Sequence, residues 1–157
     1  MAWVKRYPGT ITLDVGVVIF TGTAAQNSAF LLGVDNSLSL YASAWNNDLR
    51  STAAINNNQW THLAVTYDGS GIMSSPAVQG YINGAVVTLV NAAGPSGQAV
   101  TTTGNAYSVG APIGRTGYNF NGEVANLQIY DRALSATEIS VNCKVFVDRF
   151  DGASCEN

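Results

Sequence analysis

The hydrophobic positions of the sequence fall in short runs rich in Val, Ile, Thr and Tyr, separated by Gly, Asn, Asp, Ser or Pro. The runs recur roughly every ten residues, a spacing typical of an antiparallel sandwich or barrel. Within residues 61–67 apolar and polar positions alternate, which places Leu63 and Val65 on one face of a strand. The pattern predicts strands at Ala2–Lys5, Val15–Thr21, Ala29–Val34, Ser37–Ala44, Leu49–Ala54, Thr61–Tyr67, Val78–Ile82, Ala85–Val90, Tyr107–Gly110 and Glu123–Tyr130.

Two local signals refine this pattern. Asn83 and Gly84 separate two apolar runs and predict a tight hairpin, because both residues readily adopt a positive φ. Ser135 and Glu138 have the spacing of a capping box at the start of a helix. We therefore predict an all-β fold, an antiparallel sandwich of two sheets, with one short helical turn near residues 135–140.

Composition narrows the set of partners. The 157 residues suffice for one domain, and 46% hydrophobic residues can bury a substantial core. Only 11% of residues are charged, against about 25% in average domains, and the net charge is −3. The chain therefore has no basic field to attract nucleic acid or an anionic membrane surface. Its apolar runs are strand-sized, far below the ~20 residues of a membrane helix, so we expect neither nucleic acid nor membrane insertion.

Three segments carry a family resemblance: NQWTHLAVTYDG at residues 58–69, GYING at 80–84 and FNGEVANLQIYDRALSATEI at 120–139. In order and spacing they resemble laminin G-like domains of the concanavalin A-like lectin and glucanase class. The resemblance covers residues 2–140 and implies a jelly roll of about a dozen strands in two antiparallel sheets. It further implies a module without catalytic activity that binds glycans or proteins, or that builds an extracellular or viral surface.

The C-terminal segment departs from that family. Related domains usually begin with a strand that contains Phe-Asp-Gly, and here this motif occurs at the end of the chain. We predict that residues 141–157 form a strand and a cysteine loop that replace the missing first strand. The strand could fill its own subunit, as a circular permutation, or a neighbouring one, as a donated strand; a plain extra edge strand is the third alternative. The residues assigned to strand exchange are Val145, Phe146, Val147, Phe150, Asp151 and Gly152.

Both cysteines, Cys143 and Cys155, lie in this segment. A disulfide between them would close a short loop and indicate an oxidising compartment. Free thiols in a particle assembled in the cytosol are the alternative. Neither cysteine has the histidine partner and spacing of a zinc site.

The residues that could support catalysis are few. Glycosidases of related fold place two carboxylates at alternate positions of one strand, whereas residues 123–127 offer only Glu123. A single carboxylate cannot act as both acid and nucleophile. The only histidine, His62, lies within a predicted strand and is expected to be structural. We therefore predict that the protein is not an enzyme.

Several residues are candidates for binding. Trp45, Asn46 and Asp48 occupy a predicted hairpin tip, and Tyr118 precedes a turn. An exposed Trp can stack on a sugar or form an assembly contact, unless its ring folds back on the sheet. Asp68 and Asp131 are candidate calcium ligands in loops, although Asp is also common in turns for local reasons.

Three functions agree with these observations. The first is a structural subunit of a filament, fibre or virion coat, which fits the low charge and the displaced strand. The second is a lectin-like module for carbohydrate binding or adhesion, and the third is a degenerate glycosidase. The expected partners are copies of the chain or other surface proteins, and glycans under the second hypothesis. The expected location is extracellular, on a cell surface or on a virion.

Overall fold

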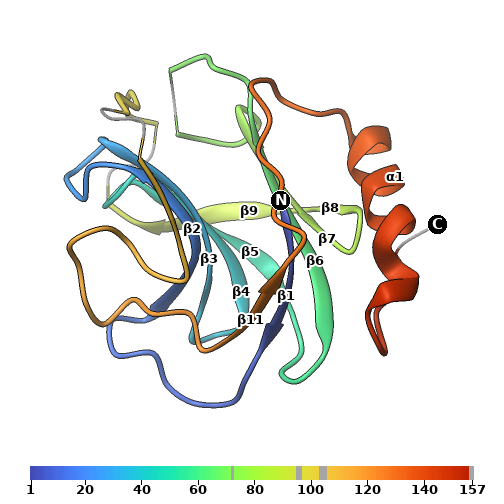
Figure 1. Cartoon of the computed structure of the whole chain (residues 1–157). Helices are drawn as coiled ribbons and strands as arrows, with labels where there is room; N and C mark the ends of the chain where they lie inside the picture. The colour runs from blue at the N-terminus through green and yellow to red at the C-terminus, as the bar shows by residue number, and fades with distance from the viewer. Residues whose placement is uncertain (72, 95–96, 103–105, 156–157) are drawn as a thin grey trace.

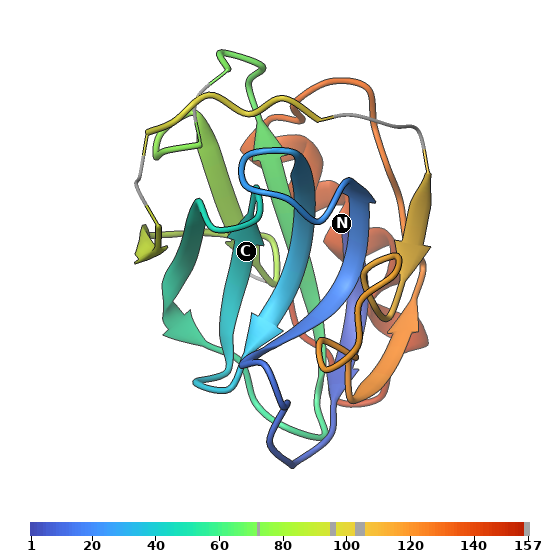
Figure 2. The same cartoon turned by 90° about the vertical axis from the view of Figure 1, so that its left-hand side faces the viewer.

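The computed structural model describes residues 1–71, 73–94, 97–102 and 106–155, which form two antiparallel sheets packed face to face (Figures 1 and 2). The first sheet has the order β11 (Gly122–Ala125), β1 (Ala2–Arg6), β6 (Trp60–Tyr67), β7 (Val78–Ile82), β8 (Ala85–Val87). The second sheet has the order β10 (Tyr107–Val109), β2 (Val15–Gly22), β3 (Ala29–Asp35), β4 (Ser39–Ser43), β5 (Asp48–Ala54), β9 (Leu89–Ala93). The predicted antiparallel sandwich is confirmed.

The main core lies between the sheets and follows the predicted alternation. On β1, Ala2 and Val4 point into the core, while Trp3 points to the outer face. On β6, Leu63 is fully buried in the same core and Val65 packs against it. Strand register and burial thus agree with the period of two along the sequence.

Turn chemistry decides where strands end. The predicted hairpin at Asn83 and Gly84 joins β7 to β8, with φ values of 52° and 86°. The predicted strand Ala85–Val90 is divided at Thr88, where the chain leaves the first sheet and enters the second as β9. The predicted strand Glu123–Tyr130 ends at β11, because Asn126 adopts a left-handed φ of 50°.

The C-terminal strand prediction is wrong. Residues 136–146 form helix α1 (Ala136–Phe146), and Val147–Arg149 form a short 3-10 helix, η1. The residues assigned to strand exchange therefore lie in these helices and in the turn that follows them: Val145, Phe146, Val147, Phe150, Asp151 and Gly152. The helical turn predicted near residues 135–140 is the start of this longer helix.

Helix α1 forms because its first turn is capped and the residues that follow can continue it. Ser135 accepts a hydrogen bond from the Glu138 amide, and the Glu138 carboxylate accepts one from Ser135, which completes the capping box. Residues 136–151 contain neither Gly nor Pro, so a helix that has started meets no breaker. Ile139 and Cys143 are spaced to fall on one helix face, and both are buried.

Helix α1 covers the outer face of the five-stranded sheet, on the side away from the other sheet (Figure 1). Ile139 packs there with Leu134, Ala64 and Tyr81. A disulfide joins Cys143 of the helix to Cys155, as predicted, and so ties the end of the tail, residues 141–155, to the helix. None of the helices that the structure describes is long and apolar enough to cross a membrane.

An aromatic cluster fixes the rest of the tail. The Phe150 ring lies 4.8 Å from the centroid of Trp3 and 4.6 Å from that of Trp60. Trp3 is fully buried beneath it although it points away from the core. The tail thus covers the outer face of its own sheet, where the alternation along β1 and β6 leaves large aromatic side chains.

Candidate functional site

A cavity of about 210 Å³ lies on the outer face of the six-stranded sheet, onto which Figure 2 looks. Apolar side chains of β2 and β3 form its base, and its walls come from the β4–β5 hairpin and from loops around residues 14 and 118. All four residues predicted to bind a ligand line it: Trp45, Asn46, Asp48 and Tyr118. The fold therefore brings Tyr118 to the hairpin tip that carries the other three.

The turn of the β4–β5 hairpin positions the first of these residues. Trp45 and Asn46 have φ values of 67° and 58°, as the central residues of a type I′ turn do. A positive φ is rare for a bulky residue and costs on the order of 1–3 kcal/mol. The Ser43 hydroxyl offsets part of this cost, because it accepts a hydrogen bond of 2.7 Å from the Trp45 amide. The Ala44 amide closes the turn on the Asn47 carbonyl at 3.0 Å.

The Trp45 indole rests on the sheet and still lines the cavity. Its ring meets Phe20 edge-on at 6.0 Å and lies 5.3 Å from Tyr118. The guanidinium of Arg115 lies 5.6 Å from the ring centroid, within cation–π range. The prediction that this ring folds back on the sheet and the prediction that it forms a binding surface are therefore compatible.

Asp48 is the polar centre of the cavity. Its side chain is 7% exposed and accepts hydrogen bonds from the Tyr41 hydroxyl at 2.8 Å, from the Ser43 hydroxyl and from the Asn47 amide at 3.0 Å. Burial, together with the charge and hydrogen bond of Asp48, raises the pKa of Tyr41 above its ordinary value. Tyr41 is therefore protonated at neutral pH and holds Asp48 in place as a donor.

Sequence reasoning did not assign Asp14 or Tyr41 to this site, although both line the cavity. Asp14 precedes β2 with a left-handed φ of 69° and brings a second carboxylate to the cavity. Its charge also contributes to the raised pKa of Tyr41. Tyr41 could have been found, because alternation along β4 places it on the same face as Ser43, next to the hairpin tip. No signal in the sequence places Asp14 at this cavity, since only the sheet order β2, β3, β4 brings it near.

The sequence matches one family model over residues 1–140, described as the concanavalin A-like lectin/glucanases superfamily. The chain belongs to this superfamily. A comparison with curated protein sequences found no match.

Two solved structures share the concanavalin A-like fold of this chain. One is a protein of Bacteroides ovatus ATCC 8483 provisionally assigned as a carbohydrate binding protein, with TM-score 0.62 and 18% identity over 88% of this chain. The match spans 38% of that protein, so the chain corresponds to well under half of its length. The other is the native heptameric SAP-like pentraxin of Limulus polyphemus, with TM-score 0.58 and 19% identity over 90% of this chain and 67% of the pentraxin.

The other candidates of this concanavalin A-like chain lie apart from the cavity. The Asp68 carboxylate accepts a hydrogen bond of 2.8 Å from the Ser70 amide, which lowers the pKa of Asp68 and marks it as a turn residue. Asp131 is exposed at another cavity. Across the described ranges, no three His, Cys, Asp or Glu side chains gather closely enough to hold a metal ion. Glu123 is exposed, and its carboxylate accepts a hydrogen bond from the Tyr7 hydroxyl.

Proposed function

We propose that this chain is a non-catalytic, lectin-like carbohydrate-binding module and that the Trp45 cavity is its sugar site. The observation that carries the proposal is the conformation of Trp45. A left-handed Trp is costly, yet the hairpin holds it there and places the indole beside a buried carboxylate. Backbone strain of this kind is concentrated at functional sites, where the surrounding structure compensates for it.

The lining suits the two sides of a sugar ring. The indole of Trp45 and the phenol ring of Tyr118 offer apolar faces to the C–H side of a pyranose. The carboxylates of Asp48 and Asp14 and the amide of Asn46 can accept or donate hydrogen bonds to its hydroxyl groups. The provisional assignment of the Bacteroides ovatus protein as carbohydrate binding is consistent with such a role.

The charge of the cavity narrows the ligand class. Two carboxylates line it, and the one cation described nearby is Arg115, which lies 5.6 Å from the Trp45 ring centroid and donates to the Ala24 carbonyl at 2.9 Å, so negative charge predominates. A negatively charged sugar would meet repulsion from Asp14 and Asp48 in a partly buried space, where charges are poorly screened. We therefore expect a neutral sugar in preference to a uronic or sialic acid.

A glycan array that carries both neutral and acidic glycans tests this proposal. The chain should retain neutral glycans, and Trp45→Ala and Tyr118→Ala should each weaken binding at least about tenfold, as expected when a stacking contact of over 1 kcal/mol is lost. Tyr130→Ala, which removes an exposed aromatic side chain at the other cavity, serves as the control and should bind normally. Circular dichroism verifies that each variant is folded. Absence of any glycan binding, or unchanged binding by both cavity variants, rejects the site.

A structural role in a filament, fibre or coat is the second candidate. Its main argument, a donated strand, no longer applies because the tail is helical and packs on its own chain. One observation still favours it: Val109 on the edge strand β10 and nearby Ile113 are apolar and are 55% and 47% exposed. Light scattering should then report an assembly that Val109→Lys reduces to monomers, whereas a wild-type monomer argues against this role.

The Cys143–Cys155 disulfide supports an extracellular or surface location for either role. Disulfides persist in secreted proteins and are reduced in the cytosol. Labelling of free thiols in protein isolated from its native source tests this point. Unreactive cysteines support the location, and two reactive thiols in the folded protein contradict it.

A further inference from the structure

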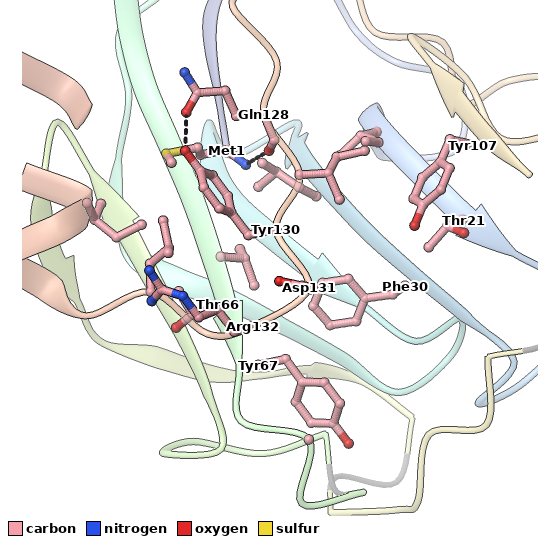
Figure 3. A pocket seen from close by; sticks show the side chains of 17 residues that line it. Met1, Thr21, Phe30, Thr66, Tyr67, Tyr107, Gln128, Tyr130, Asp131 and Arg132 are labelled. Carbon is pink, nitrogen blue, oxygen red and sulfur yellow. Dashed lines mark hydrogen bonds between the residues drawn. The ribbon is translucent and has the colours of Figure 1, made fainter. Parts of the chain in front are cut away.

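A second and larger cavity, of about 390 Å³, opens between the two sheets at the end of the sandwich where β1 begins (Figure 3). We call it the inter-sheet pocket and define it by six residues from its walls and rim: Ile19, Phe30, Val65, Tyr67, Tyr107 and Ile129. It shares no lining residue with the Trp45 cavity. Its volume lies within the range of about 300–1,000 Å³ that is common for small-molecule sites.

The walls of the pocket come from the core itself. Ile19 and Phe30 belong to the six-stranded sheet, and Val65 and Tyr67 belong to the five-stranded sheet. All four pack against the main core yet are only partly buried, and their side chains line the pocket. The rings of Phe30 and Tyr67 stack across the two sheets at 5.9 Å and an angle of 30°. Figure 3 shows Phe30 between Tyr67 and Tyr107 in this view.

The segment that closes the pocket, residues 128–134, is held in place. The Gln128 amide donates to the Met1 carbonyl at 2.9 Å, and the Tyr130 hydroxyl donates to the Gln128 side chain at 2.8 Å. At the other end Leu134 is buried against the residues under α1. This side of the opening is therefore formed by anchored chain.

The charges at the rim exclude one class of ligand. Arg132 lines the pocket, but its guanidinium makes two hydrogen bonds to the Glu138 carboxylate, at 3.0 Å and 2.5 Å. Its charge is thus already paired, and the remaining charged side chain of the described lining is Asp131, an anion. The N-terminal amine of Met1 also lies at the pocket, where it donates to the Gln128 carbonyl at 2.9 Å, and burial lowers its pKa to about 6, so it is mostly uncharged near pH 7. An acid such as a fatty acid would therefore find no unpaired side-chain cation among the described lining residues and would face repulsion from Asp131.

Two tyrosine hydroxyl groups at the pocket are available for hydrogen bonds to a ligand. Both Tyr67 and Tyr107 line the pocket, Tyr107 is 55% exposed, and neither hydroxyl makes a hydrogen bond to a residue that the structure describes. A phenol can donate to a carbonyl oxygen or accept from a hydroxyl group. From the apolar walls, the paired Arg132 and these two hydroxyls, we propose that the inter-sheet pocket binds an uncharged, mostly apolar ring compound that carries a hydroxyl or carbonyl group.

Fluorescence titration with N-phenyl-1-naphthylamine, a neutral apolar probe, tests the pocket. Wild-type protein should bind one probe with a saturable increase in fluorescence. Ile129→Trp and Thr21→Trp add bulk from opposite walls at partly exposed positions and should each weaken binding at least about tenfold. Trp45→Ala should bind the probe within about twofold of wild type, because the sugar site is separate. Lack of saturable binding, or unchanged affinity in both blocking variants, overturns the proposal.

Competition with a matched pair of ligands tests the class. 2-Naphthol is neutral near pH 7, and 2-naphthoate has the same rings with a negative charge. We expect 2-naphthol to displace the probe at least about tenfold more effectively. Equal or stronger displacement by 2-naphthoate rejects the assignment to uncharged ligands. Since this site does not depend on the Trp45 cavity, a failed glycan array leaves the result of this titration unaffected.

Discussion

Burial of His62 should make the stability of the protein depend on pH. The side chain is 2% exposed on the outer face of β6, with its ring 5.4 Å from that of Trp3. Its Nδ1 atom has no hydrogen-bond partner among the described residues. Burial, and then the charge of the chain's N-terminal ammonium, lower the pKa of His62 from 6.5 to about 4. The folded protein therefore keeps this histidine neutral under conditions that protonate it in the unfolded chain.

The sign and size follow from proton linkage. Between pH 6.5 and about pH 4 the unfolded state binds the additional proton, so the free energy of unfolding falls as the pH falls. Above pH 6.5 both states are neutral and the contribution is fully present. Relative to neutral pH, the loss amounts to about 2 kcal/mol at pH 5 and about 3 kcal/mol at pH 4. This is a large share of the 5–15 kcal/mol that is typical for a domain.

Urea denaturation followed by Trp fluorescence measures the effect at several pH values between about 4 and 7.5. His62→Phe removes the titrating group, fills most of the same space and leaves every carboxylate in place. The difference in unfolding free energy between the two proteins should move by about 3 kcal/mol in favour of the variant as the pH falls. A difference that stays constant within about 0.5 kcal/mol would refute the reasoning, because other groups titrate equally in both proteins.

Two further predictions concern the tail. Phe150→Ala removes the ring that contacts Trp3 and Trp60 and should lower the free energy of unfolding by about 2 kcal/mol, less than the loss of a fully buried Phe. Phe146→Ala, on the helix, is the control that tests whether the loss of any Phe in the tail has this effect. Reduction of the Cys143–Cys155 disulfide, which spans 12 residues of sequence, should lower it by about 3 kcal/mol in chemical denaturation. Equal stability of Phe150→Ala and wild type, or of the reduced and oxidised proteins, contradicts the respective prediction.

The fold was predictable wherever local pattern and tertiary context agree. Alternation located the strands, and Asn83 with Gly84 located a hairpin, because a period of two and a positive φ are both local properties. The strand prediction for the tail was wrong because two local signals conflict there. Val145, Phe146 and Val147 resemble a strand by composition, but the capping box at Ser135 starts a helix that no breaker stops.

The candidate site was predictable residue by residue but not as an assembly. Trp45 and Asp48 were recognisable from the hairpin tip, and Tyr118 from its turn. The positions of Tyr118 and Asp14 beside this hairpin depend on strand order, which sequence alone does not supply. The left-handed φ of Trp45 was likewise not visible, because Trp rarely adopts it and no neighbouring Gly announces it.

Gly94 links the fold to the sugar site and allows a sharper test than removal of Trp45. It has a φ of +72°, and a Cβ built there would lie 1.9 Å from the Asn46 carbonyl oxygen. Because this contact is with backbone, Gly94→Ala must displace the turn that carries Trp45. Gly152 has the same φ of +72° with nothing within 4 Å, so Gly152→Ala carries the conformational cost of about 1 kcal/mol without the collision.

The cost of a positive φ at alanine should therefore lower the free energy of unfolding of both glycine variants by a similar amount. The collision should lower it further in Gly94→Ala. Only Gly94→Ala should weaken glycan binding, by about tenfold or more if the indole shifts away from the sugar face. The comparison keeps every lining side chain of the cavity intact, so it separates the position of Trp45 from its presence. Equal glycan affinity of Gly94→Ala and Gly152→Ala would mean that the strained turn does not position the indole for binding, which removes the main support for a sugar site at this cavity.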